Sequence, residues 1–249
     1  MYITNMDMKL TWICYIWIMI ATVPCFIGAF QCNNVEIVSR AEWNASEPKG
    51  TTNFTGNKPY ATIHHTAMAR CFDLAACKRQ IKVIQDFHQN NRSWWDIGYN
   101  FLIGEDGRVY EGRGWYSKGA HAGLPFNNLA YGISIMGNFM TFLPDKKALD
   151  AFKNLVQCGI DNGRIQSNYS LIGHRQANEP GYTVCPGTAL YCHVQTWEHF
   201  ERYQQDGTFD NATCANIPTG SANHKTYSIY LLLSGLFAHI LQTTLTDFL

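Results

Sequence analysis

The sequence predicts a single α/β domain with a central mixed β-sheet flanked by about three α-helices. Short β-prone runs alternate along the chain with segments whose apolar residues recur at helical spacing. Two of these runs flank a tight Asp-Gly turn, which indicates an antiparallel hairpin within the sheet. A chain of 249 residues has room for one such domain with an extension at each end.

Strands are expected where β-branched and aromatic residues cluster between turn residues. A run that is apolar throughout indicates a strand at the centre of the sheet, which describes residues 131–137. The last run is short and ends directly before His174. After a short extended arm at 35–38, the expected strands in chain order are 60–64, 98–103, 108–111, 131–137 and 170–173.

Helices are expected where an apolar stripe at helical spacing faces a polar one. Asp73 is placed to cap the first helix, and Pro144 with Asp145 opens the second. A third helix closes the domain. In chain order, the expected helices are 73–91, 145–163 and 188–200.

The two ends of the chain differ in composition from the middle. Residues 1–29 are typical of a secretory signal, with an uncleaved signal anchor as the alternative. The domain is expected over 30–203, followed by a polar linker at 204–225 and a hydrophobic tail at 226–249. The tail fits a lipid-anchor signal or a membrane span, with an amphipathic or disordered tail as the alternative. We therefore expect an extracellular protein, secreted or attached to the outer cell surface through its tail.

The charge balance disfavours two kinds of partner. Nineteen basic and nineteen acidic side chains cancel, so nothing in the net charge favours nucleic acid or a polybasic membrane contact. Recognition must therefore depend on local sites. Asn-x-Ser/Thr triplets are compatible with the secretory route and lie at Asn44, Asn53, Asn91, Asn168 and Asn211.

The expected extracellular location guides the interpretation of the cysteines. Two of the nine lie in the signal, and the odd number that remains implies one thiol with another role in an oxidising environment. Cys185 is the candidate, as a metal-bound thiolate. Connectivity cannot be deduced from sequence alone, so the pairing is a hypothesis. The pairs we expect are Cys71–Cys77, Cys32–Cys158 and, by default, Cys192–Cys214.

A metal site is indicated by residues far apart in the sequence. His174 lies close to Cys185, whose thiol is in a Pro/Gly turn. Upstream, a predicted strand ends in His64 and His65, and because side chains alternate between faces, only one of them is expected to bind the metal. A His, His, Cys set with the fourth position open to water is typical of catalytic rather than structural zinc. Taken alone, each histidine is more often an ordinary core or surface residue. We expect Zn²⁺ as the cofactor.

The chain resembles the peptidoglycan recognition proteins, the animal relatives of phage lysozyme-like zinc amidases, over roughly Val35 to Phe200. The motifs that carry the resemblance occur in one order. They are Ile63-His64-His65-Thr66, Asp96-Ile97-Gly98-Tyr99-Asn100-Phe101, Tyr110-Glu111-Gly112-Arg113-Gly114-Trp115, Gly119-Ala120-His121, Gly173-His174-Arg175 and Thr183-Val184-Cys185-Pro186-Gly187.

The resemblance implies zinc bound by His64, His174 and Cys185, with Tyr99 and Thr183 facing the water. Tyr99 would orient that water or stabilise the developing oxyanion, and Thr183 would bind the same oxygen. Family members without the ligating cysteine bind without amidase activity, whereas this chain has Cys185. The implied reaction is cleavage of the amide between N-acetylmuramic acid and L-alanine in bacterial peptidoglycan, in innate immunity. The alternative is an immune receptor that binds and signals; the sequence identifies no protein partner.

The substrate contacts are also implied by the resemblance. Arg113 matches an arginine found in relatives that prefer meso-diaminopimelic acid peptides, and its guanidinium can hold the extra carboxylate of that residue. Those relatives usually carry Gly-Trp where this chain has Ser93-Trp94. Trp94 is expected to face sugar rings, with core packing as the alternative. His65 and His121 are expected in the groove, in contact with the glycopeptide.

Overall fold

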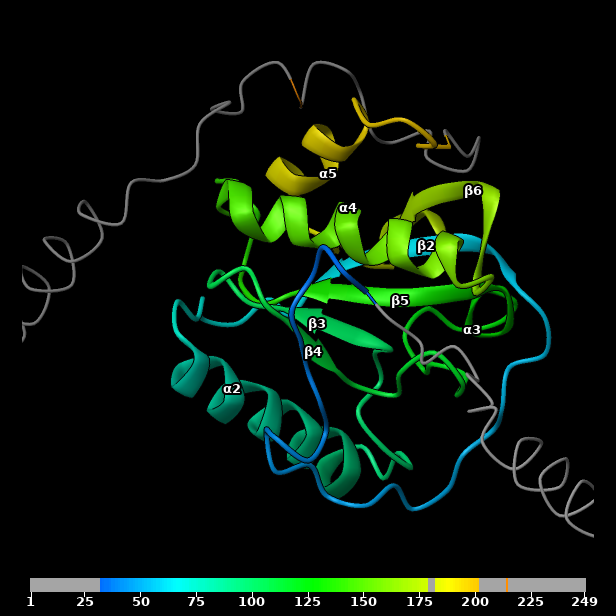
Figure 1. Ribbon diagram of the computed structural model, residues 1–249. Coiled ribbons are helices and arrows are strands. Elements are labelled where there is room, and N and C mark those ends of the chain that lie inside the picture. Colours follow the sequence, from blue (N-terminus) through cyan, green and yellow to red (C-terminus); the bar gives the residue numbers. More distant parts are fainter. Residues whose placement is uncertain (1–31, 179–181, 202–213, 215–249) are drawn as a thin grey trace, which may run out of the picture. The chain divides into compact units, whose positions relative to one another are not determined.

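The computed structural model describes residues 32–178, 182–201 and 214 (Figure 1). The predicted secretory signal, the hydrophobic tail and almost all of the linker lie outside these residues, as does Asn211. The boundaries of the domain therefore remain predictions. Within the described part of the chain, no helix combines the length and hydrophobicity needed to cross a bilayer.

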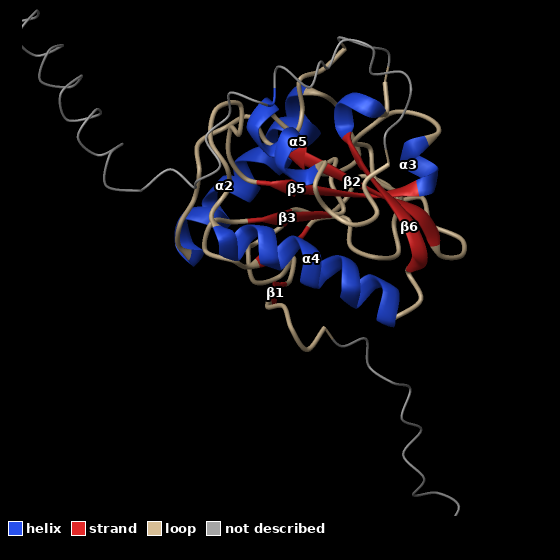
Figure 2. Ribbon diagram, turned by 90° about the horizontal axis from the view of Figure 1, so that it is seen from above, coloured by secondary structure: helices blue, strands red, loops and turns tan. Residues whose placement is uncertain are grey.

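One mixed sheet forms the centre of the domain, with strand order β1-β4-β3-β5-β2-β6. The antiparallel pair is β3 with β4, across the predicted Asp-Gly turn, and the other neighbouring strands pair in parallel. Figure 2 shows β3, β5 and β2 side by side. The strands are β1 (Ile37–Val38), β2 (Lys58–His65), β3 (Phe101–Ile103), β4 (Val109–Glu111), β5 (Ala130–Ile135) and β6 (Ile165–Gly173).

Helices cover both faces of this sheet, with α2 on one side and α4 with α5 on the other (Figure 1). The helices are α2 (Leu74–Asp86), continued by a π-helical turn (Phe87–Asn91), α3 (Phe126–Leu129), α4 (Lys146–Asp161) and α5 (Thr188–Val194). The α/β class with a mixed sheet is confirmed.

Helix α2 begins and packs as its sequence predicts. The carboxylate of Asp73 accepts a hydrogen bond of 2.8 Å from the backbone N–H of Ala76, which satisfies one of the free donors of the first turn. The apolar stripe of the helix places Cys77, Ile81 and Ile84 in the core. Ile81 has no exposed surface, so its truncation to alanine would cost about 2–5 kcal/mol of stability.

The C-terminal part of the domain differs from the sequence prediction. Helix α5 ends at Val194 instead of Phe200, because the chain turns back to pair with β6. The backbone N–H of Leu171 donates to the carbonyl of His199 (2.7 Å), and that of Glu201 donates to the carbonyl of Leu171 (3.0 Å). Strand β6 begins five residues earlier than expected, at Ile165, and α3 was not predicted.

Within the part of the chain that the structure describes, three disulfides hold loops to this framework. They are the pairs hypothesised from the sequence: Cys32–Cys158, Cys71–Cys77 and Cys192–Cys214. Among the described residues, Cys185 is the free cysteine, and it is buried.

Candidate metal centre and substrate site

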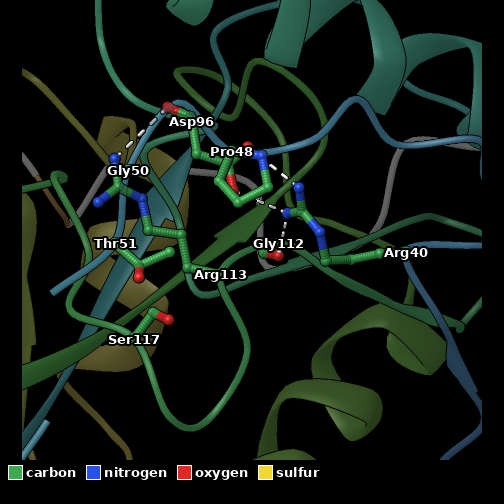
Figure 3. A pocket seen from close by; sticks show the side chains of 8 residues that line it. All are labelled: Arg40, Pro48, Gly50, Thr51, Asp96, Gly112, Arg113 and Ser117. Atoms are coloured by element: carbon green, nitrogen blue, oxygen red, sulfur yellow. Dashed lines mark hydrogen bonds and ion pairs between the residues drawn. The ribbon is translucent and has the colours of Figure 1, made fainter. Parts of the chain in front are cut away.

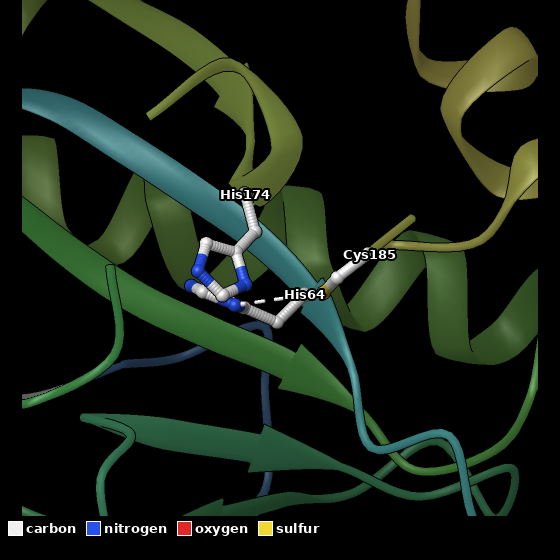
Figure 4. A group of neighbouring side chains, drawn as sticks. All are labelled: His64, His174 and Cys185. Atoms are coloured by element: carbon white, nitrogen blue, oxygen red, sulfur yellow. Dashed lines mark hydrogen bonds between the residues drawn. The ribbon is translucent and has the colours of Figure 1, made fainter. Parts of the chain in front are cut away.

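Three side chains from separate segments meet where strands β2 and β6 end (Figure 4). His64 lies near the end of β2, His174 directly follows β6, and Cys185 lies in the loop before α5. Because β2 and β6 pair in parallel, with Ile63 opposite Gly173, the two strands deliver their histidines to the same place. One potential ligand atom from each of the three residues lies within 4.8 Å of the others. The structure thus brings together the three predicted ligands.

The spacing and chemistry of these donors fit a zinc ion. Sγ of Cys185 lies 3.7 Å from Nδ1 of His64, and a sulfur and a nitrogen bound to one tetrahedral zinc are about 3.5 Å apart. Imidazole and thiolate are both donors that zinc prefers. Three protein ligands suit a zinc that keeps one coordination position for water or substrate.

Burial keeps the free ligands uncharged. It lowers the pKa of His174 to about 4 and raises the pKa of the Cys185 thiol to about 12. Burial, together with the neighbouring histidines, also holds the pKa of His64 well below its ordinary value. A divalent cation reverses the preference at the cysteine, because it stabilises the thiolate directly.

The loop that carries Cys185 is fixed by hydrogen bonds on several sides. The backbone N–H of His65 donates to Sγ of Cys185 (3.3 Å), and the backbone N–H of Cys185 donates to Oγ1 of Thr183 (3.1 Å). The backbone N–H of Arg175 donates to the carbonyl of Cys185 (3.0 Å), and its guanidinium donates to the carbonyl of Val184. The sulfur is therefore held in place by the fold before any metal binds.

Tyr99 lies beside this cluster. Its ring centroid is 5.3 Å from that of His64, and burial, with Cys185 close by, raises the pKa of its phenol above the ordinary value. The hydroxyl therefore stays protonated and can donate a hydrogen bond at neutral pH. Thr183, two residues before Cys185, places its hydroxyl on the loop that carries the sulfur.

Trp94 lies on the surface, with 37% of its area exposed. Its ring stacks on His88, with centroids 4.7 Å apart, and Nδ1 of His88 accepts a hydrogen bond from the backbone N–H of Gly98 (3.1 Å). The sequence indicated no role for His88. No local pattern marks this contact, because it joins the π-helical turn to the segment that holds Tyr99. Ser93, before Trp94, has a left-handed φ of 56°.

Arg113 lines a cavity of about 120 Å³ (Figure 3). Its Nε donates to the carbonyl of Ile97 (2.7 Å) and its Nη1 to that of Lys118 (2.9 Å), so Arg113 also joins two turns. Across the cavity, Arg40 forms an ion pair of 2.9 Å with Asp96. Two guanidinium groups and one carboxylate give the lining an excess of positive charge, which suits an anionic ligand group.

His65 and His121 are both buried, with exposures of 5% and 7%. Nδ1 of His65 accepts a hydrogen bond from the backbone N–H of Phe139 (3.3 Å), and Nδ1 of His121 lies 3.0 Å from Nε2 of His64. The structure thus places both side chains against the backbone and the metal ligands. Their expected contact with glycopeptide stays a prediction.

The mixed α/β sheet and the cluster of two histidines and a cysteine are the features expected from the sequence for a protein of the amidase class. The family model described as N-acetylmuramoyl-L-alanine amidase matches residues 55–188. The chain belongs to the peptidoglycan recognition protein family, as its motifs predicted.

Two relatives and one solved structure illustrate the similarity. Peptidoglycan recognition protein 1 of Bos indicus is 42% identical over 187 residues, which cover 75% of this chain and 95% of the relative. Peptidoglycan-recognition protein LB of Drosophila melanogaster is 40% identical over 183 residues, covering 73% and 77%. The structure of peptidoglycan recognition protein-LE in complex with tracheal cytotoxin, a monomeric diaminopimelic acid-type peptidoglycan, matches with a TM-score of 0.64 and 42% identity, covering 66% of this chain and 95% of that one.

Proposed function

We propose that this protein is a zinc-dependent N-acetylmuramoyl-L-alanine amidase that binds bacterial peptidoglycan and cleaves the amide between N-acetylmuramic acid and L-alanine. The observation that supports this most directly is the convergence of His64, His174 and Cys185 at one edge of the sheet. These residues would hold the zinc. The relatives of this chain are named as peptidoglycan recognition proteins, which supports peptidoglycan as the substrate.

The chemistry divides between the metal and the chain. Zinc in this site would supply Lewis-acid chemistry, by acidifying a water and polarising the amide carbonyl. The protonated phenol of Tyr99 would donate a hydrogen bond to the oxygen that gains negative charge, and the hydroxyl of Thr183 would bind the same oxygen. The backbone N–H of His65 stabilises the negative charge on the sulfur of Cys185. His65 therefore acts in this proposal through its main chain.

For the substrate we propose peptidoglycan of the diaminopimelic acid type. Arg113 and the positively charged cavity that it lines with Arg40 offer a place for the additional carboxylate of diaminopimelate. The exposed face of Trp94 suits the apolar face of a sugar. The similarity to a solved protein that holds a diaminopimelic acid-type fragment supports this choice. We place the protein outside the cell, secreted or attached to the surface, in innate immunity.

A test compares the parent protein with Cys185→Ser. We expect zinc by elemental analysis, and release of stem peptide from purified peptidoglycan, for the parent alone. Sedimentation with insoluble peptidoglycan should be the same for both proteins, because the surface around Trp94 and Arg113 does not include the sulfur. As a control, zinc is removed from the parent with a chelator and then restored. Turnover should be lost and then recovered, which separates loss of the metal from damage to the protein.

The same test separates the alternative function, a receptor that acts by binding and signalling. The parent protein could sediment with peptidoglycan yet contain no zinc and release no peptide. That result would exclude the amidase function and favour the receptor function. Equal turnover by the parent and Cys185→Ser would also exclude the proposed role of the metal.

A further inference from the structure

We propose that His121 is a positioning residue for the metal site. Its Nδ1 accepts a hydrogen bond from Nε2–H of His64, which turns the other ring nitrogen of His64 toward the metal. This inference rests on the proposed zinc site and adds to it a residue that is not a ligand.

The two rings form one buried pair. Nε2 of His64 and Nδ1 of His121 are 3.0 Å apart, and the rings meet edge to face with centroids separated by 4.9 Å. The opposite nitrogen of His64, Nδ1, lies 3.7 Å from Sγ of Cys185. Each nitrogen of His64 thus faces a different partner, with the metal ligand on one side and His121 on the other.

The protonation of His64 follows from this arrangement. A neutral imidazole carries one proton, and a nitrogen that binds a metal cannot hold it. If Nδ1 of His64 binds zinc beside Cys185, the proton must be on Nε2. The proton on Nε2 of His64 then points at His121. Nδ1 of His121 lies at hydrogen-bonding distance.

The ring of His121 is held firmly enough to act as this acceptor. A Cβ atom on Gly132 of β5 would lie 2.3 Å from Cγ of His121, and one on Gly119 would lie 2.4 Å from its Cδ2. The ring therefore occupies a space that only glycine leaves open at both positions. The side-chain oxygen of Asn127 accepts hydrogen bonds from the backbone N–H groups of His121 (2.8 Å) and Ala122 (2.9 Å).

This placement favours a role on the metal ligand over direct substrate contact. His121 is 7% exposed, and its Nδ1 is committed to His64. Partners of this kind orient a ligating histidine and raise its basicity, and their loss typically lowers metal affinity by about 10- to 100-fold.

A matched pair of variants isolates the acceptor. Asparagine and leucine have nearly the same shape, and the asparagine oxygen takes the place of Nδ1 whereas leucine offers no acceptor. Zinc affinity would be measured by competition with a chromophoric chelator, on parent, His121→Asn and His121→Leu. We expect about 10- to 100-fold weaker binding for His121→Leu, and an affinity within a few-fold of the parent for His121→Asn. Equal affinities, or equal losses in the two variants, would overturn the proposal.

A second measurement uses the parent protein and does not depend on the folding of a variant. Nitrogen-15 spectra of the zinc-loaded protein report which ring nitrogens carry protons. We expect Nε2 of His64 to be protonated and Nδ1 of His121 to be unprotonated; the reverse assignment would overturn the inference.

Binding of peptidoglycan by the metal-free Cys185→Ser protein, with and without His121→Leu, tests the substrate contact. Unchanged binding would show that His121 acts only on the metal ligand, whereas a large loss would show that it contacts the glycopeptide. A parent that binds no zinc would refute the proposed function together with this inference. Zinc binding that is insensitive to His121 would refute the inference alone.

Discussion

The backbone N–H of His65 donates a hydrogen bond of 3.3 Å to Sγ of Cys185, although the two residues are 120 positions apart. The contact joins strand β2 to the loop before α5. Hydrogen-bond donation to sulfur favours the thiolate over the thiol. The fold thus offsets part of the cost of burying a negative charge before any metal is present.

At pH 6, below the pKa of about 7 of a zinc-bound water, zinc binding should release about one proton. The pKa of His174 is lowered to about 4 and that of His64 lies well below its ordinary value, so neither has a proton to lose. The pKa of Cys185 is raised to about 12, so its thiol must lose one. Calorimetry in two buffers of different protonation enthalpy measures this number. Zinc affinity should rise roughly tenfold per pH unit near neutrality; release of no proton, or of two, would contradict these states.

Arg113→Ala should lower turnover of diaminopimelic acid-type peptides more than that of lysine-type peptides. The guanidinium would be lost from the charged cavity, and only the first substrate has a carboxylate to place there. Since Arg113 also donates to the carbonyls of Ile97 and Lys118, the variant will be less stable. The readout is therefore the ratio of kcat/KM for the two substrates, measured on one preparation. An unchanged ratio would remove Arg113 from substrate selection.

Ser93→Gly should stabilise the protein by about 0.5–1 kcal/mol. Ser93 has a φ of 56°, a conformation that costs an L-residue roughly 1–2 kcal/mol and glycine almost nothing, while glycine adds entropy to the unfolded chain. Urea unfolding measures the difference. Because the change also removes the Asn91 glycosylation triplet, Asn91→Gln is the matched control. An equal gain in stability for Asn91→Gln would show that the loss of the glycosylation triplet, and not the relief of the Ser93 backbone conformation, causes the effect.

His88 should make stability depend on pH in the acidic range. Burial, followed by the charges of Arg113 and Arg92, lowers its pKa to about 4, and its Nδ1 must stay unprotonated to accept from Gly98. A lowered pKa in the folded state gives stability that is present above about pH 6.5 and lost as pH falls toward 4. His88→Asn keeps an acceptor that does not titrate. With chelator present, its Tm should fall less than that of the parent between pH 6.5 and 4, and equal slopes would refute this.

The elements that could be predicted from sequence are those with a strong local pattern. Asp73 and the apolar stripe behind it define α2, and the uniformly apolar run at 131–137 identifies β5. The candidate ligand set could also be predicted, because two histidines and an unpaired cysteine are a chemically distinctive combination. The predictions of α2 and β5 depend on residues close together in the sequence, whereas the ligand set was joined from distant residues by their chemistry and by the family resemblance.

The features that were not predicted depend on contacts between distant segments. The end of α5 at Val194 follows from the pairing of Phe200 with Leu171, which overrides local helical spacing. The buried place of His121 depends on the glycine at position 132 in another strand. No local pattern distinguishes an open groove histidine from one packed beneath a metal ligand.

Strand β2 lies inside the sheet between β5 and β6, and this position affects the order in which the sheet can form. Its neighbours β5 and β6 both follow it in the sequence, so β2 leaves the ribosome long before either partner exists. A nascent chain that ends before residue 165 leaves one edge of β2 unpaired, and an unpaired strand edge is a template for aggregation. The sheet is completed only after β6 has been synthesised, and until then one edge of β2 has no neighbouring strand to pair with.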